Sequence, residues 1–162
     1  MQRFAPRRII ALGDSFHDTT AGGRLSEASR QMVRRLTDAA EFVWVTGNHD
    51  PHPPTEWGGT VAEAFVLGGV TFRHEPSPSS MEAPEDAGHL HPVARVSGRG
   101  KSLRRRCFVG CGARMVLPAF GAYTGGLDIR DAAFGALWPR PGEVRAFLLG
   151  RDQVYAFGPG VA

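Results

Sequence analysis

Short apolar runs, each ended by a polar turn, mark the first third of the chain. The run Arg8–Leu12 stops at Gly13 and the run Phe42–Val45 stops at Thr46, so both are predicted to be buried strands. Between them, apolar residues recur at helical spacing around Ser26, a residue suited to cap a helix: Leu25, Met32, Val33, Leu36 and Ala40. A strand, a helix and a strand in this order predict a crossover that leaves the two strands parallel.

The rest of the chain has the pattern of a β-rich fold. Ala64–Leu67 and Val70–Arg73 are β-like runs joined by Gly68-Gly69, a suitable hairpin turn. The segment Glu75–Gly88 is rich in Pro, Ser and acidic residues, and we expect an exposed loop there. Five more short runs follow, with a last hairpin turn at Gly150-Arg151-Asp152: Val93–Val96, Cys107–Val109, Met115–Leu117, Val144–Leu149 and Val154–Phe157. We expect one domain over residues 1–162, an α/β sandwich with a mixed sheet.

Length and composition narrow the class of protein. A chain of 162 residues with 42% hydrophobic residues fits one globular domain. It has no run of about 18 apolar residues, so we expect neither a membrane span nor a secretory signal, and a cytoplasmic location. Cys107 and Cys111 have no second cysteine pair, and we expect two reduced, partly buried thiols rather than a zinc site.

Positive charge is concentrated in one segment. Residues 95–106 contain no carboxylate, and their cations are Arg95, Arg99, Lys101, Arg104, Arg105 and Arg106. Such a stretch can gather a polyanion, because each neutralised phosphate releases condensed counterions. A solvated hairpin rim would have the same composition, so charge alone leaves both interpretations open.

Histidines beside Gly, Asp or Asn at predicted strand ends are the main chemical signal: His17, His49, His74, His89 and His91. Imidazole, carboxylate and amide oxygen together form a ligand set suited to Mn, Fe or Zn rather than to Ca. Because the loops that follow parallel strands meet at one sheet edge, we expect Asp14 and Asn48 to lie together.

The individual histidines differ in what they indicate. His89 and His91 are two residues apart, so an extended segment would point both to one side. His52 lies in a Pro-rich loop and is predicted to be an incidental surface residue. His17 is close enough to Asp14 to reach the site, but it would equally serve to cap a loop.

These residues resemble the ordered motifs of the calcineurin-like metallophosphoesterase superfamily, which are D-x-H, G-D, G-N-H-[DE], H and G-H-x-H. The last four are matched by Gly13-Asp14, Gly47-Asn48-His49-Asp50, His74 and Gly88-His89-Leu90-His91. Longer segments are similar to the ligase-associated DNA-damage-response endonuclease family (PdeM): Gly13–His17, His74–Pro76, Gly88–Pro92, Gly98–Arg104 and Leu117–Leu127. This likeness covers nearly the whole chain. It implies a sandwich of mixed β-sheets flanked by helices.

The resemblance also implies roles for the matched residues. Asp14 would bridge two divalent metal ions, Mn²⁺ ahead of Fe or Zn. Asn48, His74 and His89 would complete one metal site, and His91 would belong to the other. His49 would act on the oxyanion or leaving group as an acid instead of binding metal, as a two-metal phosphoryl transfer requires.

The same resemblance implies a substrate and partners. The chain would be an endonuclease that hydrolyses phosphodiester bonds of DNA in DNA repair, with DNA ligase and helicase as partners. Arg99, Arg104 and Arg105 follow the histidine motif directly, and we expect them to hold phosphates of the nucleic acid.

The chain departs from the family pattern at its start. The motif D-x-H would precede Arg8–Leu12 and is not found, so we expect the N-terminal strand of the fold to be missing. With Asp14 and His91 alone at the second position, we expect close to one bound divalent ion and weak hydrolysis. We also expect an unpaired sheet edge that favours association.

Two other functions agree with the same residues. The metal-binding motifs would equally serve a small-molecule phosphatase or a nucleotide phosphodiesterase. A non-catalytic scaffold that docks with ligase or helicase would account for the missing D-x-H motif.

Overall fold

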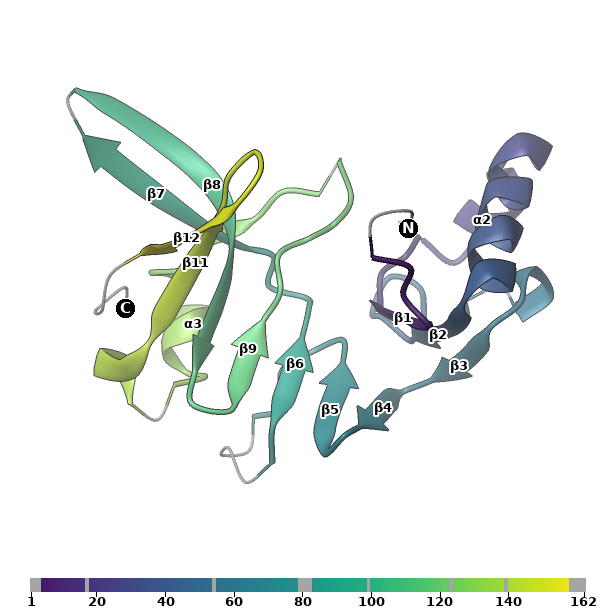
Figure 1. The fold of residues 1–162 in the computed structure, drawn as a ribbon, viewed down its shortest axis with the longest axis horizontal. Helices are drawn as coiled ribbons and strands as arrows, with labels where there is room; N and C mark the ends of the chain where they lie inside the picture. The colour runs from purple at the N-terminus through teal and green to yellow at the C-terminus, as the bar shows by residue number, and fades with distance from the viewer. Residues whose placement is uncertain are drawn as a thin grey trace. The chain divides into compact units, whose positions relative to one another are not determined.

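The computed structural model describes residues 4–16, 18–53, 55–78, 83–98, 100–122, 124–138 and 140–157 (Figure 1). The chain forms two compact units, whose border in the sequence runs through one hairpin. The first unit contains Met1–Gly68 and Phe72–His74, and the second contains Gly69–Thr71 and Glu75–Ala162. The prediction of one domain over the whole chain stays a prediction, and each unit is described by itself.

A three-stranded parallel sheet and one long helix make up the first unit. Strand β1 (Arg8–Leu12) pairs with β2 (Glu41–Val45), and β2 pairs with β3 (Thr60–Ala62). Helix α2 (Glu27–Ala39) connects β1 to β2 after the short helix α1 (Ala21–Arg24), and the 3-10 turn η1 (Thr55–Trp57) precedes β3. The predicted strands, the helix and the parallel pairing are confirmed.

Local chemistry explains where α2 begins and what covers β2. The Ser26 hydroxyl accepts a hydrogen bond from the amide of Ser29, which satisfies one of the donors at the helix start. Residues Phe42–Val45 of β2 are all buried. The Trp44 indole donates to the carbonyl of Gly58, and Phe16 packs edge-on against Trp57 with ring centroids 5.4 Å apart. These aromatic contacts support the loop that follows β1.

The second unit is built around the long strand β8 (Lys101–Cys111). It pairs antiparallel with β7 (Pro92–Gly98), β9 (Arg114–Val116) and β11 (Arg145–Leu149). Figure 1 shows β7 and the first half of β8 as a two-stranded ribbon that extends beyond the other strands of this unit. β12 (Val154–Phe157) pairs antiparallel with β11, which confirms the predicted last hairpin.

Parallel and antiparallel neighbours are mixed in this sheet, whose order runs β10-β7-β8-β9-β6-β5. β10 (Leu127–Asp128) is parallel to β7, and β6 (Glu85–Ala87) is parallel to β9. The predicted hairpin of β4 (Ala64–Leu67) and β5 (Val70–Arg73) is present at the border of the two units. The fold is therefore α/β with mixed sheets, as predicted.

Eleven buried residues form the core of the second unit. They come from its strands, from helix α3 (Ala132–Gly135) and from the segment beside the 3-10 turn η2 (Pro141–Glu143): Ala94, Cys107, Val109, Cys111, Val116, Ile129, Phe134, Trp138, Val144, Ala146 and Leu148. Among the described residues, no helix is long and apolar enough to cross a membrane.

One prediction for this unit is wrong. Residues 85–87 belong to strand β6 and not to an exposed loop, and Glu85 is 5% exposed. Its carboxylate forms a buried ion pair with Arg114 at 3.0 Å and accepts a hydrogen bond from the amide of Ser77. A charged residue can occupy this interior position because its partner lies on the adjacent strand β9.

Both cysteine thiols are buried, which gives a test of the fold. Cys107 and Cys111 form no disulfide, and burial, together with the nearby charge of Asp128, raises the pKa of Cys107 to about 12. At pH 8 fewer than about one Cys107 thiol in a thousand is then ionised. We expect no thiol of the native protein to react with Ellman's reagent at pH 8 within minutes, and two to react after denaturation. Rapid labelling of the native protein would contradict the burial of this strand.

Candidate functional site

The loop that follows β1 is held by one buried carboxylate. Asp50, which is 2% exposed, accepts hydrogen bonds from the amides of Asp14 and Ser15 at 2.8 Å and from that of Phe16 at 3.2 Å. Both oxygens are used, Oδ1 by Asp14 and Oδ2 by the other two amides. Three consecutive N–H groups therefore point at one side chain, which fixes the path of the backbone at Asp14.

Opposing effects act on the charge of Asp50. Burial raises the pKa of this carboxyl, the three amide donors lower it, and the nearby charge of Asp14 raises it again. The net direction is upward, because removal from water outweighs the hydrogen bonds. The Asp50 carboxylate thus anchors the loop, although its burial removes it from the water that would stabilise its charge.

Three lone-pair atoms converge beside this loop. His74 is 6% exposed, and its Nδ1 lies 2.8 Å from the carbonyl oxygen of Leu12. A carbonyl oxygen carries no proton, so Nδ1 must donate, and in the neutral ring Nε2 is left with a lone pair. That Nε2 lies 2.8 Å from Oδ1 of Asn48 and 3.2 Å from Oδ2 of Asp14.

This arrangement suits a cation. A divalent ion between these atoms would bind two oxygens and one imidazole nitrogen, whereas a protonated Nε2 that donates to both oxygens is the arrangement without an ion. Nitrogen and oxygen ligands of this kind hold Mn, Fe or Zn, and a second hydrogen bond from a ligating histidine, here to Leu12, fixes its ring. The donor set of Asp14, Asn48 and His74 therefore fits a divalent metal ion, and the predicted proximity of Asp14 to Asn48 is confirmed.

Two glycines make this convergence possible. A Cβ atom at Gly13 would come within 2.7 Å of Cγ of His74, inside van der Waals contact, and Gly13 has a positive φ of 78°. A Cβ atom at Gly47 would overlap Asp14 and approach Oδ1 of Asp50 to 2.8 Å. No side chain fits at either position while the ligands keep their places.

The other histidines of the motifs differ in exposure and in backbone conformation. His49 is exposed, and its backbone amide donates to Oδ1 of Asp14 at 2.8 Å. His89 and His91 belong to the second unit, between β6 and β7, and both have a left-handed backbone, with φ of 63° and 48°. His52 is exposed, as predicted, and His17 lies outside the described residues.

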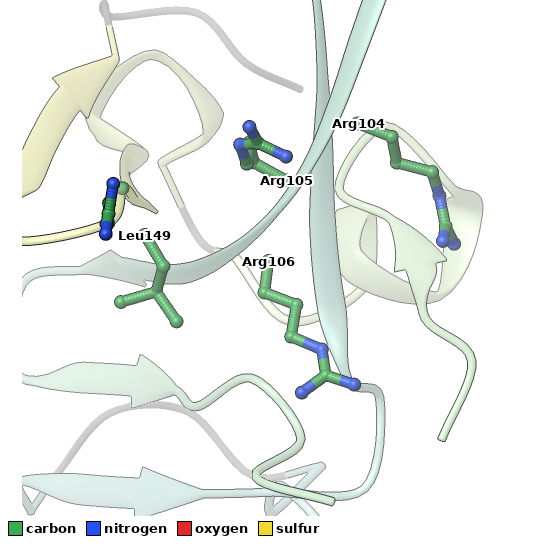
Figure 2. Close-up of a pocket in the computed structure, with 6 residues that line it drawn as sticks. Arg104, Arg105, Arg106 and Leu149 are labelled. Atoms are coloured by element: carbon green, nitrogen blue, oxygen red, sulfur yellow. The ribbon is translucent and has the colours of Figure 1, made fainter. Parts of the chain in front are cut away.

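The cationic stretch supplies half of the residues that line a pocket in the second unit. This pocket has a volume of about 390 Å³, and its lining consists of Arg104, Arg105, Arg106, Leu149, Gly150 and Arg151. Figure 2 shows Arg104, Arg105 and Arg106 leaving β8 in different directions, with Leu149 nearby. Within the described part of the chain the lining has no carboxylate, so the pocket is suited to an anion. Arg99, the third arginine predicted to hold phosphates, lies outside the described residues.

The three arginines of β8 are not equivalent. Arg104 donates to the carbonyl of Gly126, and Arg106 donates to several carbonyls of the segment after β9. Among the described residues, no hydrogen bond or ion pair involves the guanidinium of Arg105 or of Arg151. These two arginines are therefore available to a ligand.

The roles of three residues could not be predicted from the sequence. Asp50 was part of a matched motif, but nothing in the pattern showed that its carboxylate faces the other polar loop. Arg106 was counted as a cation, although its role depends on carbonyls more than ten positions away. Arg151 stood in a predicted turn, and only the pairing of β11 with β8 brings that turn beside Arg105.

The role of Asp50 gives a prediction. Asp50→Asn keeps the shape of the side chain but turns one acceptor into a donor, which then faces backbone N–H groups. We expect a loss of about 1–3 kcal/mol in the free energy of unfolding. We also expect faster hydrogen exchange at the amides of Asp14, Ser15 and Phe16. Asp38→Asn, at an exposed position of α2, is the matched control. Unchanged exchange at the three amides would contradict the anchoring role.

Comparison with known proteins places the chain among nucleases. No protein-family model matches it, and no curated protein does. The crystal structure of Pseudomonas putida nuclease MPE is similar, with a TM-score of 0.72 and 34% sequence identity. The match covers 93% of this chain and 70% of the Pseudomonas chain. With this identity over this length, the chain belongs to the family of the Pseudomonas putida nuclease MPE.

Proposed function

We propose that the chain is a metal-dependent phosphodiesterase that cleaves DNA. The family indicates a hydrolase acting on phosphodiester bonds. The observation that carries metal dependence is the convergence of His74 Nε2, Asn48 Oδ1 and Asp14 Oδ2. Two oxygens and an imidazole nitrogen in one place are a ligand set that Mn, Fe or Zn accepts. The motifs that match the calcineurin-like superfamily support the same chemistry.

The residues of the first unit hold the ion and keep its ligands in place. Asp14 supplies charge, Asn48 a neutral oxygen, and His74 a nitrogen whose orientation the Leu12 carbonyl sets. A divalent ion bound there would lower the pKa of a water molecule and neutralise charge on the phosphate. Mn²⁺ is our first choice, with Fe or Zn as alternatives, because all three accept mixed nitrogen and oxygen ligands.

Further ligands are proposed from the motif order. His89 would complete the shell of this first ion, and His91, with Asp14 as a bridge, would belong to a second one. What supports this is the match of Gly88-His89-Leu90-His91 to the last superfamily motif. The unusual backbone conformation of both histidines adds support, because such conformations occur often at functional positions.

His49 is proposed as the catalytic acid. It is exposed to solvent, while its backbone amide is tied to Asp14, so its main chain is fixed next to the metal ligands. A protonated imidazole can give a proton to the departing alkoxide, and its removal lowers turnover by about 100-fold or more in typical cases. The ligand Asn48 and this acid are then neighbours in the chain, with separate tasks.

DNA is the proposed substrate, and DNA repair the proposed setting. Arg105 and Arg151 in the basic pocket, with Arg104 and Arg99, would hold phosphates that flank the scissile one. A role beside DNA ligase and helicase follows from the resemblance to the ligase-associated endonucleases. The several positive charges of the pocket lining support a polyanionic substrate, because each neutralised phosphate adds to the binding.

Three histidine variants test the proposed function. We expect His74→Ala to lose Mn²⁺ binding, measured by calorimetry, together with hydrolysis of bis-p-nitrophenyl phosphate. We expect His49→Ala to bind Mn²⁺ like the unaltered chain while its turnover falls by about 100-fold or more. His52→Ala, at an exposed histidine outside the motifs, is the control and should change neither. Equal loss of metal and activity in both test variants would remove the acid role, and activity without metal would refute the proposal.

The basic pocket makes a separate prediction about salt. The double variant Arg105→Ala, Arg151→Ala should bind single-stranded DNA more weakly, and the logarithm of its affinity should fall less steeply with the logarithm of salt concentration. We expect the slope to change by about 0.7 for each phosphate that the variant no longer neutralises. Arg34→Ala, Arg35→Ala on α2 removes the same charge from exposed positions and should leave the slope nearly unchanged. An unaltered slope in the pocket variant would exclude the pocket from the binding surface.

A further inference from the structure

The segment after β9 exposes an aromatic side chain completely. Phe120 lies in the segment that comes after Val116, the last residue of β9. Its relative exposure is 103%. Single exposed apolar residues are common on proteins and by themselves indicate nothing. Phe120 differs because hydrogen bonds from a neighbouring side chain fix the backbone that carries it.

That side chain is Arg106. Its Nη1 donates to the carbonyl of Ala119 at 3.0 Å and to that of Phe120 at 3.4 Å. Its Nη2 donates to the carbonyl of Gly121 at 2.6 Å and to that of Thr124 at 3.4 Å. Hydrogen bonds from a guanidinium are about twice as strong as neutral ones, and the planar fork sets their directions. The carbonyls on both sides of Phe120 are therefore turned toward Arg106, while the ring stays in solvent.

The surroundings of this ring are cationic. Arg106 also lines the basic pocket, so the pocket and the Phe120 segment share one side chain. The pocket offers Arg105 and Arg151 to a ligand, and its described lining residues carry no negative charge. An anionic partner would meet little repulsion here.

We propose that Phe120 is a base-stacking residue for single-stranded nucleic acid. The partner must bring phosphates for the pocket and a flat apolar face for the ring, and an unpaired nucleotide has both. In duplex DNA the base faces are stacked on one another and out of reach, so the contact selects unpaired bases. Arg106 is a positioning residue, because it holds the segment that carries the ring. The inference deepens the proposed function by naming a residue that contacts bases of the substrate, and it rests on that function.

An abasic oligonucleotide isolates the stacking contact. Binding of fluorescently labelled oligothymidylate and of an abasic strand of equal length is measured with chelator present, so that no strand is cleaved. We expect Phe120→Ala to weaken binding of the base-containing strand by about tenfold, the typical effect of losing one base–aromatic stack. Binding of the abasic strand should not change. Phe120→Trp should restore the affinity, and its emission should be quenched by the base-containing strand alone.

Controls separate this inference from folding and from the proposed function. Met32→Ala removes a similarly exposed apolar side chain from α2 and should bind both strands as the unaltered chain does. Because Phe120 is wholly exposed, its variants should unfold at the same temperature as the unaltered chain. Equal affinity of Phe120→Ala and the unaltered chain for oligothymidylate would overturn the inference. An equal loss of affinity for the base-containing and the abasic strand, or for single-stranded and duplex DNA, would also overturn it. Absence of Mn²⁺-dependent hydrolysis in the unaltered chain would instead refute the proposed function and leave the stacking result intact.

Discussion

The buried carboxylate of Asp50 is the constraint on which the rest of the first unit's polar site depends. It draws three successive amides of the loop after β1 toward the loop after β2, and both loops are thereby closed against each other. Asp14 then reaches its left-handed conformation, with its carboxylate beside Nε2 of His74. This anchor consists of the protein's own groups, so it orders the loop that carries Asp14 without a bound ion. Preorganisation of this kind strengthens binding, because little ordering of the protein remains to oppose it.

The sequence predicted the parts of the fold whose signals are local. An apolar run, a capping serine and a second run are enough to specify β1, α2 and β2, and a short crossover leaves little choice except a parallel pair. β6 was missed for a reason that is equally physical. Its residues Glu85 and Asp86 have the composition of a surface loop, and only the distant Arg114 makes Glu85 acceptable inside. Charged strands buried by ion pairs leave no periodic pattern to detect.

Prediction of the site from the sequence was limited in the same way, because contacts between distant side chains leave no local signal. The type and order of Asp14, Asn48 and His74 were sufficient to predict a metal-binding group, because polar loops after parallel strands meet. The cations of the hairpin were equally visible, but their tasks were not. The guanidinium of Arg106 donates hydrogen bonds to backbone carbonyls, while among the described residues the guanidinium of Arg105 forms none. Two arginines in consecutive positions thus differ in their hydrogen bonds, and this difference cannot be predicted from the sequence.

The left-handed backbone at Asp14, His89 and His91 carries a consequence for how such a protein can change. In the described residues, the only other non-glycine with positive φ is Ala5, so three of the four such positions fall within the motifs that resemble those of the metallophosphoesterases. Each conformation of this kind costs on the order of 1 kcal/mol, which glycine would not incur. Glycine at any of the three would avoid this cost, but it would lose the side chain, which at Asp14 accepts the His49 amide and lies beside His74. A substitution that relaxed the backbone at these positions would therefore also remove the side chain for which the motif is recognised.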